Sequence, residues 1–400
     1  MKRIVCFFLI LFICLPFAAC KEEKQPDTLV MFPSAGRSIS AQAGAVFTCS
    51  DENIATVDDS GLVIAKAPGN ATVTVKEGDK TTVYPIEVLD PAKYISLYDV
   101  TKITLKNEDI LQKVKDVMDA LLLENATWLE VSDPAYTGDK MTISYTGSVN
   151  GTAVAGFSAT NEKFILGSGD YVPGFENALI GRKKGDNLCL ELTIPNDYAS
   201  DPSLAGKPVV FDVSVNKVEQ PQHPAFDNEF VQKHTKYDNI NDFDKQEYIN
   251  AKATLAIAAM VEKSTLISDA PQALYDYYFD QYVKRLETVL YYEYQKPVSG
   301  LSEILKLLNL TEQELRDSAQ SQLAASVMQD CVFHAFMYQQ NLTLSEEEFA
   351  KGTALYVSEN GYTNLDDLLA TSGLSLADIR EVVLIDFLAL KAADMVQIEQ

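Results

Sequence analysis

Histidine is scarce in this sequence, which has only His223, His234 and His334 among its 400 residues, widely scattered. This scarcity argues against a metal site built from several histidines, and we expect no metal and no cofactor. The chain contains neither a GxxxxGK[ST] loop nor a GxGxxG motif, so nothing supports nucleotide chemistry. Basic residues are also few, 33 Lys and Arg against 57 Asp and Glu, for a net charge of −24. Without a basic stripe to follow a phosphate backbone, a nucleic-acid partner is not expected.

Cysteine spacing argues against a site built on CxxC motifs and against a disulfide-stabilised fold. No CxxC motif occurs, and beyond Cys20 only Cys49, Cys189 and Cys331 remain, in three separate regions. An odd number of isolated cysteines does not make a disulfide framework. We expect these three to be small buried hydrophobic residues.

The composition is that of a folded protein with several domains. Hydrophobic residues make up 47% of the chain, aromatic residues 10% and charged residues 22%, which suffices for real hydrophobic cores. At a typical domain size of about 150 residues, the length suggests two or three domains. The periodicity changes along the chain and predicts a multidomain α+β protein.

The N-terminus begins with a basic pair and a long apolar run. Lys2 and Arg3 precede a hydrophobic stretch over residues 4–17, shorter than the about 20 residues of a membrane-spanning helix. The pattern predicts a secretory signal over residues 1–20. Its ending, Phe17-Ala18-Ala19-Cys20, resembles a bacterial lipobox, which implies lipidation of Cys20, a tether over residues 21–27 and anchoring on the extracytoplasmic side of the cell membrane. The alternative is an ordinary signal peptide with a chance cysteine.

Residues 28–90 have the pattern of a small β-domain. Residues 71–75 alternate between apolar and polar with period two, and Asp58-Asp59-Ser60-Gly61 is a turn signal between two apolar runs. Together with residues 53–58 and 68–73, these features resemble the bacterial Ig-like domain. The resemblance implies a β-sandwich that serves as a spacer or, alternatively, as an adhesive module.

Two other regions have helical patterns. Residues 99–131 predict a linker strand and then a helix that starts at Asn107, with apolar residues at helical spacing from Ile110. Residues 224–400 predict an all-α domain with breaks at glycines. Capping boxes are expected at Thr311 with Glu314 and at Ser345 with Glu348, because a hydroxyl and a glutamate three residues later satisfy two free backbone N–H groups.

The middle of the chain returns to β alternation and carries the most specific motif. Six pieces stand in order over about 80 residues, beginning with residues 138–149 and including Tyr171-Val172-Pro173-Gly174-Phe175-Glu176 and Ile194-Pro195-Asn196-Asp197-Tyr198. They resemble the FKBP-type peptidyl-prolyl isomerases. The resemblance implies an isomerase domain over residues 132–220, an antiparallel sheet wrapped around a short helix between Gly174 and Gly181.

The resemblance also implies a binding cup for a proline ring. An X-Pro bond must rotate over a barrier of about 18–20 kcal/mol, while its cis and trans forms differ by less than about 1 kcal/mol. Such a catalyst needs a dry aromatic hollow rather than an acid or base. The residues placed there, with Phe175 as the floor, are Tyr145, Phe164, Tyr171, Val172, Phe175, Tyr198 and Phe211. The alternative is that these side chains are only hydrophobic core.

Three positions depart from the family pattern. Val154 and Ala155 align with a Phe-Asp or Phe-Glu pair, and Ser200 replaces a tyrosine that is usual in small FKBPs. A missing aromatic contact costs on the order of 1 kcal/mol of ring burial. The catalytic function predicted here is therefore weak, or has decayed into a non-catalytic binding module.

The flanking segments resemble trigger factor over roughly residues 99–397. Residues 107–128 resemble the helical lead-in to its isomerase domain, and residues 224–231, 269–274 and 344–348 follow its C-terminal chaperone domain. The printed sequence has no GFRxGxxP ribosome-docking loop, so ribosome binding is not expected. The expected partners are unfolded or proline-containing secreted polypeptides.

Aromatic side chains crowd two parts of the helical region. Large rings with polar tips suit the binding of unfolded chains, because they give contact area and remain partly wet. The candidate client-binding residues are Tyr278, Tyr282, Phe333 and Tyr338. Three functions stay open: an anchored isomerase and chaperone of secreted proteins, a non-catalytic chaperone or scaffold, and a surface adhesin that uses the Ig-like module.

Overall fold

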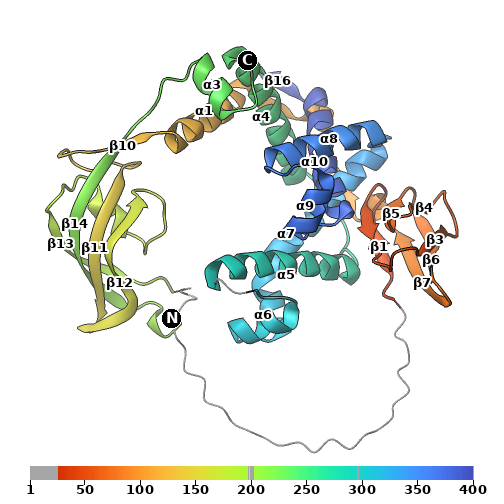
Figure 1. The fold of residues 1–400 in the computed structure, drawn as a ribbon, viewed down its shortest axis with the longest axis horizontal. Coiled ribbons are helices and arrows are strands. Elements are labelled where there is room, and N and C mark those ends of the chain that lie inside the picture. Colours follow the sequence, from red (N-terminus) through yellow and green to blue (C-terminus); the bar gives the residue numbers. More distant parts are fainter. Residues whose placement is uncertain (1–25, 197, 199–201, 295–296, 400) are drawn as a thin grey trace, which may run out of the picture. The chain divides into compact units, whose positions relative to one another are not determined.

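The chain forms two compact units. The computed structural model describes residues 26–196, 198, 202–294 and 297–399 (Figure 1). Residues 114–245 make up the first, here called the sheet unit, and residues 26–113 together with those from 246 onward make up the second, the helical unit. The chain passes from one unit to the other within helices α1 (Asn107–Glu124) and α4 (Ile240–Lys263).

The sheet unit is built on five antiparallel strands. Their bounds are β10 (Thr127–Glu130), β11 (Lys140–Val149), β12 (Thr152–Ile165), β13 (Asn187–Thr193) and β14 (Pro208–Gln222). The order is β10-β14-β11-β12, and β13 pairs with the first half of β14. Along β11, Met141 and Ile143 are fully buried, as the alternation in the sequence predicts.

One short helix packs on this sheet. It is α2 (Phe175–Leu179), which lies between Gly174 and Gly181 as predicted. Both glycines have a left-handed backbone, with φ of 90° and 81°, which a residue with a Cβ adopts only at a cost. Phe175 and Leu179 are fully buried and fix the helix to the core of the sheet. The unit also contains the 3-10 turn η3 (Pro202–Leu204) and helix α3 (Asn228–His234).

The first part of the helical unit is a small β-sandwich, here called the N-terminal sandwich. One sheet has the order β1-β7-β6-β3 and the other β2-β5-β4. The bounds are β1 (Leu29–Met31), β2 (Gly36–Ser38), β3 (Val46–Cys49), β4 (Ala55–Val57), β5 (Leu62–Ala65), β6 (Gly69–Glu77) and β7 (Lys80–Val88). At the predicted turn, the Asp58 carboxylate accepts hydrogen bonds from the backbone of Ser60 and Leu62, both at 2.9 Å.

The rest of the helical unit is mostly α-helix. The bounds are α5 (Gln272–Tyr294), α6 (Leu301–Leu308), α7 (Glu312–Gln339), α8 (Glu346–Glu359), α9 (Leu365–Ser372) and α10 (Leu376–Met395). Both predicted capping boxes are present, at Thr311 with Glu314 and at Ser345 with Glu348, and Ser375 with Asp378 forms a third.

Short elements complete this unit; the strand just before Asn107 was predicted, and the others were not. Strand β8 (Ile95–Ser96) pairs with β15 (Thr265–Leu266), and β9 (Thr104–Lys106) pairs with β16 (Gln397–Glu399). The connecting segment also contains the 3-10 turns η1 (Pro91–Lys93) and η2 (Val100–Lys102).

The N-terminal sandwich packs directly on the helices of its own unit. Phe32 is fully buried, and its ring lies 5.9 Å from that of Tyr94 and 6.2 Å from that of His334. The guanidinium of Arg37, on β2, lies 3.5 Å from the ring centre of Tyr277, on α5. The sandwich has a core of its own, which includes Met31, Val63 and Val73, and these further contacts attach it to the helices, which differs from the expectation of a free spacer.

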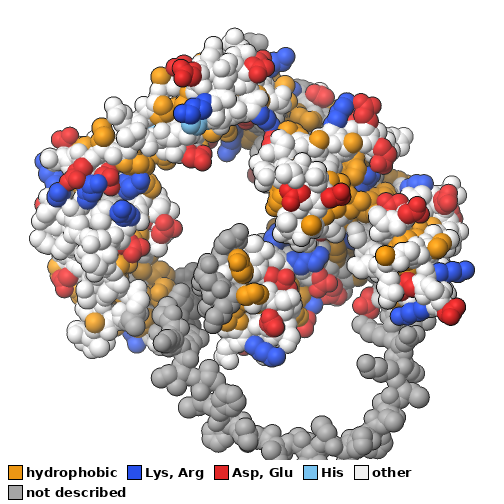
Figure 2. Space-filling view, in the orientation of Figure 1, with side chains coloured by type: hydrophobic (Ala, Val, Ile, Leu, Met, Phe, Trp, Pro, Cys, Tyr) orange, Lys and Arg blue, Asp and Glu red, His pale blue; other side chains and the backbone are white. Residues whose placement is uncertain are grey.

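The surface carries both signs of charge. On the face shown in Figure 2, acidic and basic side chains lie intermingled, although acids outnumber bases in the sequence. Among the described residues, no helix combines the length and the apolar character needed to cross a membrane.

Candidate functional site

A cavity of about 570 Å³ opens in the sheet unit, beside the loop that leads into α2. Its walls are mainly rings and aliphatic side chains, with a few charged groups at the rim. The lining residues that were predicted as the cup are Tyr145, Phe164, Tyr171, Val172, Tyr198 and Phe211. The structure thus brings together six of the seven residues, which come from β11, β12, β14 and two loops.

The rings of the cavity contact one another in a continuous set. Tyr145 lies 5.6 Å from Phe175 and 6.0 Å from Phe211, both edge to face. Tyr171 lies 4.7 Å from Phe164. Edge-to-face and offset pairs at these separations each contribute about 0.5–1.5 kcal/mol beyond their area burial. The set therefore holds the walls in place without a ligand.

Phe175 lies beneath the cavity wall and is not a lining residue, so it is not the floor that the resemblance implies. The Tyr171 ring stacks on it at 4.8 Å with an interplanar angle of 8°. Phe175 is consequently 0% exposed and is absent from the cavity wall. Its ring supports Tyr171 from below, and Tyr171 supplies the surface that a ligand would touch.

Phe157 is a wall residue that the sequence analysis missed. It lines the cavity, and its ring lies 5.9 Å from that of Tyr198 and 5.7 Å from that of Phe211. It stands on β12, three residues after Val154, which is half-buried and packs on the same core. An aromatic wall is therefore present on this strand, supplied by a different position. The side chain of Ala155 and residue Ser200 lie outside the described part of the chain.

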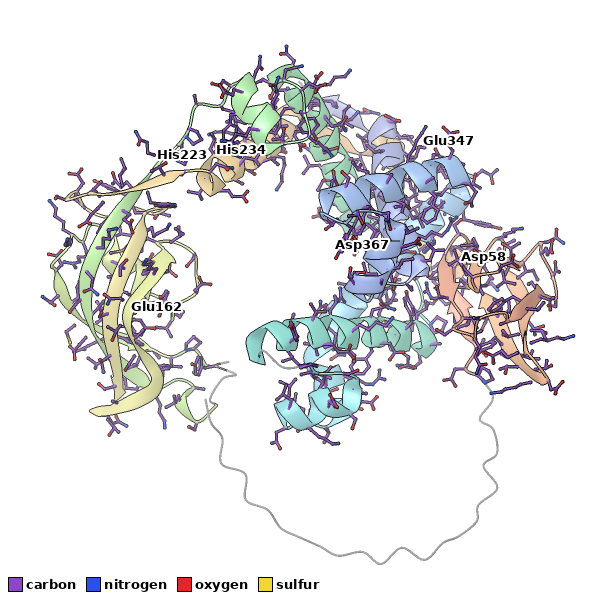
Figure 3. All side chains as sticks on the ribbon, viewed as in Figure 1. Asp58, Glu162, His223, His234, Glu347 and Asp367 are labelled. Carbon is purple, nitrogen blue, oxygen red and sulfur yellow. The ribbon has the colours of Figure 1, made fainter. Side chains whose placement is uncertain are left out.

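Charged groups lie at the rim of the cavity. Glu162 and Lys163 on β12 and Asp170 in the following loop contribute to its lining. Glu162 is labelled in Figure 3. Burial is the main cause that raises the pKa values of Tyr145 and Tyr171, and the charge of Glu162 adds to both shifts. Both hydroxyls are therefore neutral hydrogen-bond donors at physiological pH.

The loop between Phe164 and α2 is tied to the helix. The carboxylate of Glu176, in the first turn of α2, accepts a hydrogen bond of 2.6 Å from the backbone N–H of Gly167. Glu176 is 9% exposed, so this bond is sheltered from water. It restrains the segment that presents Tyr171 and Val172.

This arrangement suits rotation about a prolyl bond. An apolar, ring-lined cavity can accept a pyrrolidine ring, and its low polarity favours the twisted amide, which has lost resonance and charge separation. Since no proton has to move, the reaction needs no residue with a pKa near neutrality.

The candidate client-binding residues do not form one surface. Tyr278 and Tyr282, on α5, are half-buried and pack on a core that includes Phe279. Phe333 is 3% exposed, so its ring lies in the core and offers no surface, which corrects that prediction. Tyr338, near the end of α7, is 44% exposed and is the one of the four that presents its ring to solvent.

The cysteines also differ among themselves. Cys331 is buried, as expected, and burial raises the pKa of its thiol to about 12. Cys189 is exposed and Cys49 only half-buried, so the expectation of three buried thiols is wrong. The proposed lipidation site, Cys20, lies outside the described residues.

Comparisons with known proteins agree with this geometry. Residues 132–216 match the family model of FKBP-type peptidyl-prolyl cis-trans isomerases, and residues 37–88 match that of the bacterial Ig-like domain, group 2. The trigger factor of Clostridioides difficile is 27% identical over 257 residues, which cover 62% of this chain and 58% of that protein.

Two further trigger factors match this chain over different lengths and with different identities. That of Caldicellulosiruptor bescii is 27% identical over 309 residues, covering 74% of this chain and 68% of its own. That of Cellvibrio japonicus is 38% identical over 152 residues, covering 38% of this chain and 33% of its own. The chain thus spans little more than half the length of the first of these three relatives, the Clostridioides difficile protein. Residues 132–216 are thus similar to FKBP-type peptidyl-prolyl cis-trans isomerases, within a longer sequence similar to trigger factors.

Proposed function

We propose that this protein is a membrane-anchored, extracytoplasmic peptidyl-prolyl isomerase and chaperone that assists the folding of secreted proteins. The observation that carries the proposal is the ring-lined cavity of about 570 Å³ within the segment that matches the isomerase family. The signal pattern of residues 1–20 is the reason for the compartment.

In this proposal the cavity binds the proline ring of an unfolded segment. Tyr171 and Phe211 contact the ring, and Tyr198 covers it from the open side. A hydroxyl of Tyr145 or Tyr171 can donate a hydrogen bond to a substrate carbonyl, because both groups stay protonated. Burial of the twisted amide away from water lowers the barrier to rotation.

A refolding assay limited by proline isomerisation tests the catalytic half. We expect the full chain to accelerate the slow phase and Tyr198→Ala to lose about five- to thirtyfold of the acceleration, as expected for about 1–2 kcal/mol of lost ring contact. Phe175→Ala should abolish it if the variant folds. Tyr136→Ala is the matched control, because Tyr136 lies in the same unit, is 57% exposed and does not line the cavity.

The same assay, together with a measurement of peptide binding, separates an isomerase from a non-catalytic scaffold. If the slow phase is unchanged by the wild-type chain while a proline peptide still binds, the domain is a scaffold rather than an enzyme. If Tyr198→Ala and Tyr136→Ala behave alike, the assigned cavity is not the site.

Membrane anchoring rests on Cys20. The variant Cys20→Ala should abolish lipid labelling of the chain and release it from the membrane fraction or leave it unprocessed. Lipid labelling at the wild-type level in that variant would reject the lipobox assignment.

For the chaperone activity, we propose that exposed apolar side chains of the helical unit bind unfolded proteins. Tyr338 and Leu355 are 44% and 46% exposed, on α7 and α8. We expect the full chain to suppress aggregation of an unfolded protein, and the double variant Tyr338→Ser, Leu355→Ser to suppress it less. Equal suppression by both chains would move the client surface elsewhere.

A further inference from the structure

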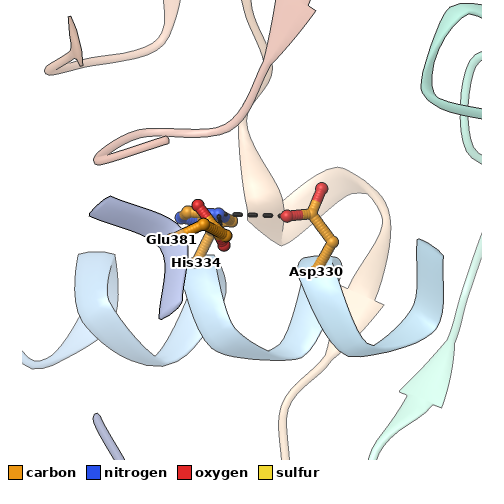
Figure 4. A group of neighbouring side chains, drawn as sticks. All are labelled: Asp330, His334 and Glu381. Carbon is orange, nitrogen blue, oxygen red and sulfur yellow. Dashed lines mark ion pairs between the residues drawn. The ribbon is translucent and has the colours of Figure 1, made fainter. Parts of the chain in front are cut away.

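Two carboxylates and a histidine meet in the interior of the helical unit. Asp330 and His334 stand one turn apart on α7, and Glu381 reaches them from α10 (Figure 4). The side chains of Asp330 and His334 are 1% and 0% exposed, and that of Glu381 is 25% exposed. The other two histidines, His223 and His234, lie in the sheet unit (Figure 3).

The spacing of these groups is that of ligands around one ion. Nε2 of His334 lies 3.0 Å from Oδ1 of Asp330 and 3.6 Å from Oε1 of Glu381, and the three ligand atoms lie within 4.8 Å of one another. Zinc bonds of about 2.1 Å in a tetrahedron place neighbouring ligand atoms about 3.4 Å apart. The separations of 3.0 Å and 3.6 Å from Nε2 of His334 lie on either side of this value.

The histidine is held in the tautomer that a metal requires. Its Nδ1 lies 2.9 Å from the backbone carbonyl of Pro33, in the turn between β1 and β2. A carbonyl only accepts hydrogen bonds, so Nδ1 carries the proton and donates it. A ligating histidine almost always makes such a second bond, which fixes its ring. The ring of Phe32 stacks on the imidazole at 6.2 Å and restrains it further.

Two buried atoms of the group are left without hydrogen bonds. Nε2 of His334 is close to Asp330, but no hydrogen bond of acceptable angle joins them. Oδ2 of Asp330 likewise has no hydrogen-bond partner. Buried polar atoms without partners are costly and rare, so their presence calls for an occupant.

Arg37 is one of two buried arginines, with Arg380, whose charges act on this group. Its Nη1 donates a hydrogen bond of 2.8 Å to the carbonyl of Gly36, and its guanidinium lies over the Tyr277 ring. No ion pair joins it to Asp330 or Glu381, all of which belong to the described residues. Two negative charges therefore face the histidine.

We propose that Asp330, His334 and Glu381 bind one divalent cation of the zinc class, with a water molecule as fourth ligand on the side where Glu381 is exposed. Calcium and magnesium prefer ligand sets made of oxygen alone, whereas an imidazole with two carboxylates suits zinc. The ion bridges α7 and α10 and, through Nδ1 of His334, fixes the turn of the N-terminal sandwich that contains Pro33. The site is separate from the isomerase cavity and does not depend on the proposed function.

The competing occupant is a proton on Nε2. Burial alone would lower the pKa of His334, but the neighbouring carboxylates of Asp330 and Glu381 raise it to about 10.

The test uses the full chain, purified without chelator. We expect about one zinc per chain by elemental analysis. Removal with EDTA should lower the melting temperature, and titration of the stripped protein with ZnCl₂ should restore it. Cobalt(II) in place of zinc should give the visible absorption of a tetrahedral site.

Glu381→Gln should weaken zinc binding by at least about tenfold with little change in volume, and His334→Ala should abolish it. Glu347→Gln is the matched control, because this glutamate is 78% exposed in α8 and pairs only with Lys351 among the described residues. A stripped chain that is folded by circular dichroism but binds no zinc overturns the proposal and leaves the proton as the occupant. The proposal also fails if Glu381→Gln binds zinc as tightly as Glu347→Gln.

Discussion

At the scale of single residues, Gly147 shows how a missing side chain shapes the cavity. A Cβ on this residue of β11 would lie 2.6 Å from Cε1 of Phe211 and 2.7 Å from Cβ of Phe157. Both rings line the cavity, so they approach each other over a backbone that carries no side chain.

We predict that Gly147→Ala impairs the isomerase more than it affects folding. The added methyl group must push Phe211 or Phe157 aside, at a cost of about 1–3 kcal/mol of stability, and the displaced ring alters the wall. The proline-limited refolding rate should fall while circular dichroism stays native. Gly36→Ala is the control, because a Cβ there makes only ordinary contacts from 3.5 Å outward. Equal activity of Gly147→Ala and the wild type would contradict this role.

Two half-buried tyrosines of the cavity wall predict the pH dependence of the reaction. The pKa values of Tyr145 and Tyr171 are raised by burial, so both hydroxyls keep their protons above the usual value of about 10. The isomerisation rate should therefore stay level from about pH 6 to pH 9, measured with a proline peptide. In the unfolded chain these tyrosines ionise near pH 10, so stability that depends on them is lost as the pH rises above that value. A rate that falls between pH 6 and 9 would mean that another group titrates in the site.

The aromatic cup could be predicted residue by residue because its members stand at fixed places in a recognisable motif. Phe157 could not be predicted in this way. It lies three residues after the expected position, and its side chain turns inward because β11 and β12 change register at bulges. The group around His334 has one local signal, the i, i+4 spacing of Asp330 and His334. The third member, Glu381, has no local sequence signal, because only the packing of α10 brings it close to Asp330 and His334.

At the scale of elements, Gly352 sets the contact between α8 and α10. A Cβ on Gly352 would overlap Cγ1 of Val383. The two helices therefore pack closely enough that no methyl group fits between them.

We predict that Gly352→Ala lowers the melting temperature despite the better helix propensity of alanine. The gain of about 1 kcal/mol in propensity is outweighed by about 1–3 kcal/mol of overpacking. Adding Val383→Ala should relieve the overlap, so the double variant should lose less stability than the two single variants added together. Strict additivity would show that the two residues do not oppose each other.

Helix boundaries were the most predictable elements, because capping boxes are local. Thr311 and Ser345 begin α7 and α8 as expected. Helix α1 starts at Asn107 but ends at Glu124, and residues 127–130 form β10 instead of continuing the helix. Strand β10 exists because it pairs with the end of β14, about 90 residues later, and the pattern of a short segment does not contain its partner.

At the scale of the whole molecule, the N-terminal sandwich is the part whose role changes most. Its strands follow from period-two alternation, and the sandwich was predicted. The attachment of the sandwich to the helices was not predicted. Phe32 contacts α7 and Arg37 contacts α5, and each contact connects residues more than 200 positions apart in the sequence. Neither side chain has a local pattern that distinguishes a docking contact from a core or surface position.

We predict that the sandwich and the helices of its unit unfold together. Phe32 is fully buried between Tyr94 and His334, so Phe32→Ala should cost about 3–5 kcal/mol. The loss should appear in the helical signal of circular dichroism and not only in the β signal. Val46→Ala, on a strand of the same sandwich where the side chain is 57% exposed, should leave the melting temperature unchanged. If Phe32→Ala melts the sandwich while the helices keep their wild-type melting temperature, the sandwich folds independently and the spacer interpretation returns.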